Sequence, residues 1–423
     1  MRCNLGSLVD FQNGFAFKSK EYADSPVDGC EVLRMGYIAR GGGFKEDDKP
    51  VYAPNSSKGN QERYRVSAND LVMAMTDMKD NVAILGCVAF INQDKRFLLN
   101  QRVGRLRVKD ESQINPRFLY YLLNSQDVLR DIRSRANSGV QVNLTTAGIL
   151  ELQLDVPEPQ IQVSIARILG ALDDKIQTNQ RINQTLEDIA KAIFKSWLVD
   201  FDPVRAKAEG RPTGLPTEIS NLFPDGFEDS DIGEIPAGWT RCSLGVLVTP
   251  QRGKTITKSK CVEGGIPVVA GGLAPAYYHN VANVSAPVVT ISASGANAGF
   301  ARLYHEDIWA SDCSYISKRQ SRFVYSWYIF LKMNQSKIYH MQQGAAQPHI
   351  YPSDLMRMEV VCSDDEKLWH HLETIVSPLF KRISICETQN QVLAELRDTL
   401  LPKLISGELR IPDAEKFLEE AGV

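Results

Sequence analysis

The sequence lacks the features of a membrane or exported protein. Its 423 residues contain no run of about 18 apolar residues that could form a membrane-spanning helix. Residues 1–10 lack the basic start and apolar stretch that are typical of a signal peptide. We therefore expect a cytoplasmic chain without a membrane partner. The length predicts two or three domains.

Metal-binding and disulfide patterns are also missing. The eight cysteines are scattered, and no two have the short spacing of metal ligands. Only six histidines occur, and the adjacent pair His370 and His371 is interpreted as the polar start of a helix. The pattern favours a reducing compartment and predicts neither a disulfide framework nor a metal site.

Catalytic motifs are absent as well. The glycine clusters at 41–43, 264–265 and 271–272 lack the context of a nucleotide-binding loop and are interpreted as turns. The chain has no GxSxG or HExxH motif, and no Asn/Asp-Pro-Pro-aromatic tetrapeptide of the amino-methyltransferase type. Residues 412–416 contain the letters of a nuclease motif, but Pro-Asp is more typical of a helix start. We expect a chain without catalytic residues and without a cofactor of its own.

The chain contains an internal duplication. Residues 2–14 read RCNLGSLVDFQNG and residues 241–253 read RCSLGVLVTPQRG, so that eight of thirteen positions are identical. A second match aligns Gln141, Leu144 and Leu150 with Gln347, Ile350 and Met356. The order along the chain is therefore globular domain, helix, linker, globular domain, helix.

Each copy ends in a long predicted helix with a heptad pattern. Residues 160–199 contain no proline, and apolar side chains recur there in alternate steps of four and three. The stripe positions are Ile165, Leu169, Leu172, Ile176, Asn179, Asn183, Leu186, Ala190, Ile193 and Trp197 in the first helix, and Leu372, Val376, Leu379, Ile383, Cys386, Asn390, Leu393, Arg397, Leu400 and Leu404 in the second.

The matched stripes predict that the two helices pair with each other, although each stripe could instead pack on its own globular domain. Asn179, Asn183 and Asn390 lie on the stripes, where a buried Asn can fix the helix register. Pro402 predicts that the second helix bends or ends near that position.

The expected fold class is α+β, with two duplicated globular α/β domains separated by two long antiparallel coiled-coil helices. The expected boundaries are 1–156 for the first domain, 157–200 for the central spacer helix, 201–238 for a linker, 239–362 for the second domain, 363–410 for the second spacer helix and 411–423 for a C-terminal tail. Strands are expected in 81–90, 103–108, 149–156, 266–270 and 287–294, and amphipathic helices in 115–132 and 323–341. Their aromatic residues Tyr120, Tyr121, Trp327 and Tyr328 are expected in the core.

The net charge of −3 alone argues against nucleic-acid binding, but the charge is unevenly distributed. Residues 1–156 have a balance of +2 and residues 239–361 of +6, whereas 157–238 have −6 and 362–423 have −5. Positive globular domains can neutralise phosphates. Acidic helices suit protein partners, although acidic surface helices are also common in other proteins.

Several segments resemble the specificity subunit of type I restriction-modification systems. They are GFAFKSKEY at 14–22, KSWLVDFDPVRAK at 195–207, LFPDGFEDSDIGEIPAGW at 222–239 and LLPKLISGELRI at 400–411. The resemblance covers nearly the whole chain, but no counterpart of IPAGW precedes the first copy. It implies that each globular copy is a target recognition domain for one half of an asymmetric, bipartite DNA sequence.

The same resemblance implies the partners. The helices would set the spacing between the half-sites and dock two modification subunits, which bind S-adenosylmethionine and methylate adenine. Restriction subunits would join and cleave double-stranded DNA with ATP and Mg. The chain itself would be a non-catalytic subunit. The alternatives are a fused or stand-alone DNA-modifying enzyme, and a coiled-coil scaffold that binds no DNA.

The candidate DNA contacts are basic and amide side chains in loops, because Arg and Lys read guanine while Asn and Gln read adenine. In the first copy they are Lys18, Lys20, Arg34, Lys79, Asn100, Gln101, Arg102 and Gln141, and in the second copy they are Lys254, Lys258, Asn297, Gln347 and His349. An isolated Lys or Arg could instead contact phosphate or solvent. The equivalent pair Gln141 and Gln347 could instead bond to a turn.

Replacing Gln347 by Ala is expected to relax the second half-site and leave the first unchanged, because the amide would no longer read its base. Modified-base sequencing of DNA from a host with this variant and its modification subunit measures both half-sites. Unchanged site selection would contradict this role of Gln347.

Overall fold

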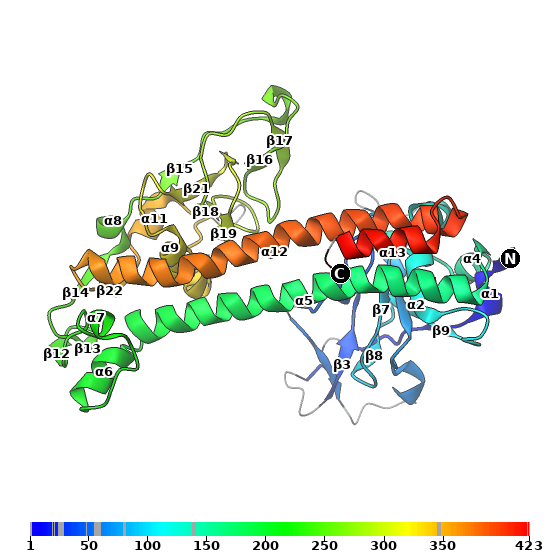
Figure 1. Cartoon of the computed structure of the whole chain (residues 1–423), viewed down its shortest axis with the longest axis horizontal. Coiled ribbons are helices and arrows are strands. Elements are labelled where there is room, and N and C mark those ends of the chain that lie inside the picture. Colours follow the sequence, from blue (N-terminus) through cyan, green and yellow to red (C-terminus); the bar gives the residue numbers. More distant parts are fainter. Residues whose placement is uncertain are drawn as a thin grey trace. The chain divides into compact units, whose positions relative to one another are not determined.

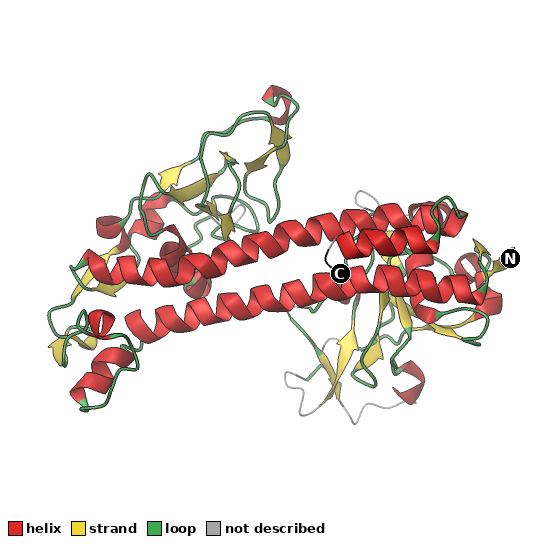
Figure 2. Cartoon of the chain, in the orientation of Figure 1, coloured by secondary structure: helices red, strands yellow, loops and turns green. Residues whose placement is uncertain are grey.

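Two long helices, α5 (Pro159–Leu198) and α12 (Glu366–Ser406), each contribute to two units of the chain. Unit 1 comprises Met1–Gln177 and Gln389–Val423, and unit 2 comprises Thr178–Thr388. The computed structural model describes residues 2–18, 20, 22–23, 29–47, 49–54, 61–78, 82–137, 141–344, 348–420 and 422. Both units are mixtures of helix and sheet (Figure 2).

The other elements of unit 1 are short. They are β1 (Arg2–Asn4), α1 (Leu5–Leu8), β2 (Val9–Asn13), β3 (Gly29–Leu33), η2 (Met35–Tyr37), β4 (Tyr52–Pro54), η3 (Gln61–Tyr64), β5 (Leu71–Ala74), β6 (Thr76–Met78), β7 (Val88–Phe90), β8 (Phe97–Leu99), β9 (Val103–Val108), α2 (Pro116–Leu123), α3 (Gln126–Ser134), β10 (Gln141–Asn143), α4 (Thr146–Leu150), β11 (Gln153–Asp155) and α13 (Ile411–Glu420).

Unit 2 has a similar series of elements. They are α6 (Asp202–Ala208), α7 (Thr217–Ser220), β12 (Phe227–Ser230), β13 (Gly233–Pro236), β14 (Thr240–Ser243), α8 (Leu244–Leu247), β15 (Gln251–Arg252), η4 (Lys258–Lys260), β16 (Ile266–Val269), β17 (Tyr277–His279), β18 (Val288–Ser292), β19 (Ala301–Tyr304), β20 (Trp309–Ala310), β21 (Cys313–Ser317), α9 (Val324–Met333), α10 (Gln335–His340), α11 (Pro352–Met356) and β22 (Glu359–Cys362).

The two units have equivalent sheet topologies. A four-stranded sheet has the order β2-β9-β5-β7 in unit 1 and β15-β21-β18-β19 in unit 2. A three-stranded sheet has the order β4-β3-β8 in unit 1 and β17-β16-β20 in unit 2, and in both sheets one pair of strands is parallel. The first strand of each globular region pairs with the strand before the long helix, as β1-β11 and β14-β22.

The central strands β5 and β18 are buried along their whole lengths, which explains the apolar sequence LVMA of β5 and the mostly apolar sequence VVTIS of β18. In unit 2, α9 packs on the four-stranded sheet (Figure 1). The centroid of its Trp327 ring lies 4.7 Å from that of Trp369 in α12. A packed layer thus connects the sheet to the long helix. In unit 1, the hydroxyl of Tyr121 in α2 donates to Asp173 in α5 at 2.7 Å.

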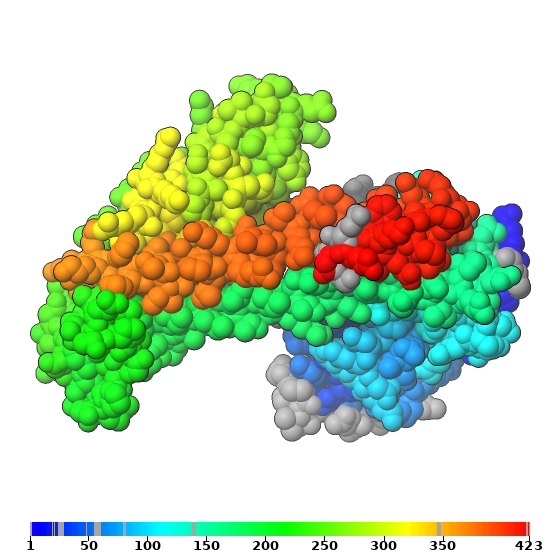
Figure 3. Space-filling view, viewed as in Figure 1, coloured from blue at the N-terminus to red at the C-terminus, as the bar shows by residue number. Residues whose placement is uncertain are grey.

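The apolar stripes of the long helices face the cores. In unit 1, Leu169 and Leu172 of α5 share a core with Leu400 and Leu404 of α12. In unit 2, the second half of α5 shares a core with the first half of α12, and the rings of Phe194 and Trp369 are 6.3 Å apart. The space-filling view shows these halves of α5 (green) and α12 (orange) against each other (Figure 3).

The three stripe asparagines differ in burial. Asn179 is only 2% exposed, whereas Asn183 and Asn390 are half-buried. The buried Oδ1 of Asn183 accepts no hydrogen bond from any residue that the structure describes. A buried amide oxygen without a partner costs free energy, so Asn183 is not explained by stability alone.

The structure corrects several predicted elements. Of the strand expected in 81–90, only Val88–Phe90 is a strand, and Thr146–Leu150 is a helix rather than part of a strand in 149–156. Each expected helix in 115–132 and 323–341 is interrupted after Leu123 or Met333. At the first interruption, the Asn124 side chain accepts a hydrogen bond from the amide of Val88 at 2.9 Å and donates one to its carbonyl at 2.9 Å.

Other findings concern helix limits and burial. The helix α12 ends at Ser406, near Pro402 as predicted, and α13 confirms the helix start predicted at Pro412-Asp413. The linker 201–238 contains two short helices and a hairpin, β12-β13. The helix α9 is buried on all sides from Val324 to Leu331 rather than amphipathic. Its aromatic residues are in the core, as are Tyr120 and Tyr121.

A carboxylate of α12 caps the first turn of α9. Glu373 accepts hydrogen bonds from the amides of Tyr325 and Ser326 at 3.0 and 2.9 Å. Burial raises the pKa of this carboxyl above its ordinary value. The capping contact therefore joins the long helix to the globular part of unit 2.

Replacing Glu373 by Ala is expected to lower the free energy of unfolding by about 1–2 kcal/mol, because two amides of α9 lose their acceptor. Chemical denaturation of the full chain measures the change. The control is Glu366→Ala, since Glu366 is 70% exposed in an ion pair with Arg322 and should contribute little. Equal destabilisation by the two variants would contradict the capping role.

Candidate nucleic-acid interface

One end of the four-stranded sheet in unit 2 gathers several loops. We define the rim of unit 2 as residues 253–257, 293–299, 309–312 and 348–350. The amide of Lys254 donates to the Ala310 carbonyl at 2.9 Å. The amide of Ala293 donates to the backbone carbonyl of Asp312 at 3.2 Å, and the amide of Ile350 donates to the carbonyl of Ala293 at 3.0 Å.

The same end of the sheet in unit 1 is built in the same way. We define the rim of unit 1 as residues 14–18, 74–78, 100–102 and 141–144. The amide of Met75 donates to the backbone carbonyl of Arg102 at 3.0 Å, and the amide of Leu144 donates to the carbonyl of Met75 at 2.9 Å. These bonds match those of Ala293 and Ile350 in unit 2, so Arg102 and Asp312 occupy equivalent positions.

The glycine that ends the duplicated 13-residue segment has a structural cause. A Cβ at Gly253 would lie 2.3 Å from the Ser311 carbonyl oxygen, and one at Gly14 would lie 1.9 Å from that of Asn100. The amides of Gly253 and Gly14 donate to Cys313 and Val103 at 2.8 and 3.2 Å. In each unit, the loop that follows the first strand of the four-stranded sheet (β2 or β15) therefore lies directly against the loop that precedes its last strand along the chain (β9 or β21).

Most predicted contact residues of unit 1 lie on its rim. Gln101 and Arg102 are exposed, and Asn100 and Gln141 are half-buried. Lys18 is an exposed rim residue, and the exposed Lys20 lies just beyond the rim. Lys79 lies outside the described residues.

Arg34 follows β3 and has protein partners. Its Nη2 forms a 2.7 Å ion pair with Asp47 and donates to the Lys49 carbonyl at 2.5 Å. Its guanidinium thus binds both Asp47 and Lys49, and structural support explains this residue at least as well as a DNA contact does.

Three predicted residues of unit 2 are brought together on its rim. Lys254 is exposed, Asn297 and His349 are half-buried, and the His349 ring is stacked on Tyr351 with centroids 6.1 Å apart. Lys258 is exposed in η4, beyond the rim. Gln347 lies outside the described residues.

Sequence reasoning missed an ion pair at the rim of unit 2. Arg252 Nη2 lies 2.5 Å from Asp312 Oδ1, and the hydroxyl of Ser294 also bonds to the Asp312 carboxylate. Arg252 could have been found, because it directly precedes the duplicated glycine in QRG. Asp312 and Ser294 could not, because their proximity depends on the sheet.

The described part of the chain holds no group of His, Cys, Asp or Glu that could bind a metal ion. Burial raises the pKa of Cys313, just behind the rim, to about 12, so its thiol stays protonated at neutral pH. Every described helix is too short or too polar to cross a membrane.

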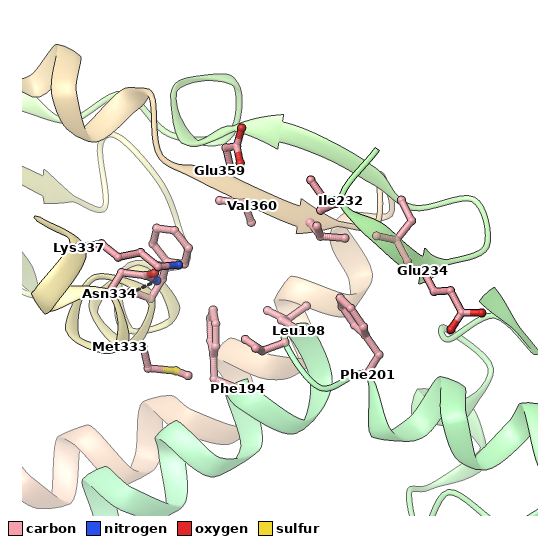
Figure 4. Close-up of a pocket in the computed structure, with 14 residues that line it drawn as sticks. Phe194, Leu198, Phe201, Ile232, Glu234, Met333, Asn334, Lys337, Glu359 and Val360 are labelled. Atoms are coloured by element: carbon pink, nitrogen blue, oxygen red, sulfur yellow. Dashed lines mark hydrogen bonds between the residues drawn. The ribbon is translucent and has the colours of Figure 1, made fainter. Parts of the chain in front are cut away.

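A pocket of about 440 Å³ lies elsewhere in unit 2 and shares no residue with the rim. Phe194 and Leu198 of α5 and Phe201 line one part of it, and Met333 and Asn334 line another (Figure 4). Glu234, Lys337 and Glu359 also line the pocket, so that its wall is partly apolar and partly charged.

Comparisons with known proteins agree with this geometry. Residues 2–188 match the family described as type I restriction modification DNA specificity domain. The HindI specificity subunit of Haemophilus influenzae is 26% identical over 366 residues, covering 70% of this chain and 77% of the relative. The MjaIX specificity subunit of Methanocaldococcus jannaschii is 24% identical over 320 residues, covering 70% of this chain and 69% of the relative.

The fold is also shared with a solved structure. The crystal structure of a type I restriction-modification S subunit from M. genitalium has a TM-score of 0.54 and 17% identity, covering 96% of this chain and 95% of that chain. The fold is that of this S subunit, and the matched domain is similar to the type I restriction modification DNA specificity domain. This chain is thus similar to specificity subunits of type I restriction-modification systems, in its matched residues 2–188 and over 70% of its length.

Replacing Gly253 by Ala is expected to separate the two rim loops, because the new Cβ has no room beside Ser311. Loss of one backbone hydrogen bond costs about 1 kcal/mol, so the Lys254 amide should exchange its hydrogen about fivefold faster. Hydrogen-exchange measurements on the full chain test this. Gly265→Ala is the matched control, because a Cβ there meets no atom within 4 Å. Equal exchange rates in both variants would contradict the prediction.

Proposed function

We propose that this chain selects DNA for a type I restriction-modification complex, and that each unit reads one half of an asymmetric bipartite target. The observation that carries the proposal is the pair of equivalent rims with different side chains. Arg102 in unit 1 stands where Asp312 stands in unit 2, and Asn143 stands where His349 stands. Equivalent backbones with different donors and acceptors suit two different half-sites.

Charge supports DNA as the partner of the rims. Lys254, Lys258 and Lys260 are exposed along one segment of unit 2, whose globular region has an excess of six basic residues. For each phosphate that such a side chain neutralises, a plot of the logarithm of the binding constant against the logarithm of the salt concentration gains a slope of about −0.9.

The helices are proposed to set the gap between half-sites and to dock two modification subunits. Within unit 2, Phe194 of α5 lies near Trp369, and Glu187 interacts with Glu387, so these parts of the helices run antiparallel. All stripe positions of both helices are buried or half-buried. This pattern supports a coiled-coil spacer.

The outer faces of the helices offer surface for protein partners. Ile189 and Ile385 in unit 2 are 43% and 58% exposed, and Val392 in unit 1 is 57% exposed. These apolar side chains occur on segments with an excess of acidic residues. Exposed apolar residues with a charged surround suit protein docking better than DNA binding.

The proposal assigns the cofactors to the partners. Modification subunits would bind S-adenosylmethionine and methylate adenine, and restriction subunits would use ATP and Mg to cleave DNA in the cytoplasm. The chain would bring to the complex the base contacts and the spacing, through its rims and helices.

Modified-base sequencing of a host that carries this chain with its modification subunits tests the proposal. A methylated bipartite sequence that depends on this chain is expected. Absence of sequence-specific methylation rejects the proposed function. The purified chain should not transfer methyl groups from labelled S-adenosylmethionine to DNA, as a stand-alone enzyme would. Its DNA binding should weaken with salt, whereas a scaffold would show no binding.

Four residues inserted near Asn179 are expected to change the gap by about one or two base pairs, because a helical turn rises about 5.4 Å and a base pair about 3.4 Å. A second variant carries a matching insertion near Asn390, which preserves the helix pairing. Both half-sites should stay unchanged.

The control is an insertion of four residues between Gly210 and Gly214 in the linker, which should leave the gap constant. Modified-base sequencing measures gap and half-sites together. Altered half-sites with a constant gap would show that the helices do not set the spacing.

A further inference from the structure

Arg252 directly precedes the rim segment 253–257 of unit 2, and one nitrogen of its guanidinium is bound to the rim residue Asp312. Its Nη2 lies 2.5 Å from Asp312 Oδ1. Among the described residues, none accepts a hydrogen bond from its Nε or Nη1. The side chain is 40% exposed. It therefore presents several N–H donors to a ligand while its position is fixed.

The carboxylate that holds Arg252 is itself fixed. Its Oδ2 bonds to the hydroxyl of Ser294, and the backbone carbonyl of Asp312 accepts from the amide of Ala293 at 3.2 Å. The two carboxylate oxygens thus bind Arg252 at the end of β15 and Ser294 in the loop after β18. The chain Ser294–Asp312–Arg252 crosses the end of the sheet from β18 to β15.

The backbone under Arg252 has little freedom as well. Arg252 pairs with Ser314 in the β15-β21 ladder, and Gly253 lies against Ser311. The carbonyl of Lys254 accepts from Trp309 Nε1 at 2.8 Å. A donor on a rigid element with a supported side chain is a better reader of bases than a lysine on a free loop.

Stability does not account for this arrangement. The two partners of the ion pair are 40% and 30% exposed, and such partly exposed pairs stabilise a fold by only about 0–1 kcal/mol. Nη2 keeps a second N–H, which forms a parallel pair of donors with Nη1–H or Nε–H. Such a pair matches the O6 and N7 acceptors of guanine in the major groove, and this bidentate match is the commonest specific protein–DNA contact.

Unit 1 has different chemistry at the same two positions. The duplicated segment places Asn13 where Arg252 stands, and Arg102 where Asp312 stands. The Asn13 amide donates to Thr146 Oγ1 at 2.9 Å, and Arg102 is exposed. The supported arginine is therefore specific to unit 2 and is not needed to form the shared rim.

We infer that Arg252, positioned by Asp312, is a specificity-determining residue that reads a guanine in the half-site of unit 2. The inference rests on the proposed function and deepens it, because it names one base and the side chain that reads it. Arg252 touches the base, and Asp312 and Ser294 are positioning residues.

The test uses the complete complex of this chain with its modification subunits. Methylation rates are measured on duplexes in which each base pair of the bipartite site is replaced in turn. For Arg252→Ala, discrimination at one G·C pair of one half-site should fall about 5- to 140-fold, the loss of one bidentate contact. Arg252→Lys should also relax that position, since an ammonium lacks the fork geometry.

Asp312→Asn should relax the same position by a smaller factor and leave other positions unchanged, because the guanidinium remains but is held less firmly. The matched control is Arg319→Ala. Arg319 is exposed in the turn at the opposite end of β21, so its loss should alter no position. The half-site of unit 1 reports whether each variant is folded and assembled.

Two results would overturn the inference. An Arg252→Ala complex that keeps full discrimination excludes base reading, and one that loses the same factor on every duplex identifies a phosphate contact. In either case the wild-type complex would still show a bipartite site. A wild-type complex without any sequence preference would instead reject the proposed function itself.

Discussion

The packing of the long helices into the cores is the constraint on which the rest of the structure depends. Neither helix belongs to one unit alone, because α5 and α12 each bury one half in each core. In unit 1, Asp173 of α5 pairs with Arg397 of α12 at 2.8 Å and accepts from Tyr121 of α2. An acidic residue in the stripe region is thus satisfied from both sides, which makes its burial tolerable. The globular regions are attached to the helices by such contacts rather than by a flexible connection.

Duplication explains why the rims are equivalent although few of their residues are alike. The matching glycines Gly14 and Gly253 remain because any side chain would collide with the neighbouring loop. A Cβ added at Gly6 would lie 3.1 Å from a side-chain atom of Leu150. One added at Gly245 would lie 2.9 Å from a side-chain atom of Met356. The close approach of a neighbouring segment explains why glycine stands at these positions in both copies. Exposed rim side chains such as Arg102 and Lys254 are outside this constraint and differ between the two units.

Periodicity and repetition made much of the fold predictable. The heptad steps predicted both long helices to within a few residues, because a stripe that repeats over 40 residues fits only a helix. The short elements were less predictable. Residues 149–150 look like a strand but lie in α4, where Thr145 caps the helix by accepting from the Gly148 amide. Ala83 and Ile84 are apolar but precede the strand β7, since the Asp77 carboxylate binds the amides of Ile84 and Leu85.

The sequence by itself determined the duplication, the two long helices, the segregation of charge and most of the rim loops. These features follow from patterns that are local or repeated, and such patterns can be recognised in the amino-acid sequence. Only the tertiary structure decided that Arg252, Asp312 and Ser294 meet, and that Arg34 is engaged by Asp47. The physical reason is that sheet pairing brings together residues up to 60 positions apart, and no periodicity along the chain encodes which of their side chains touch.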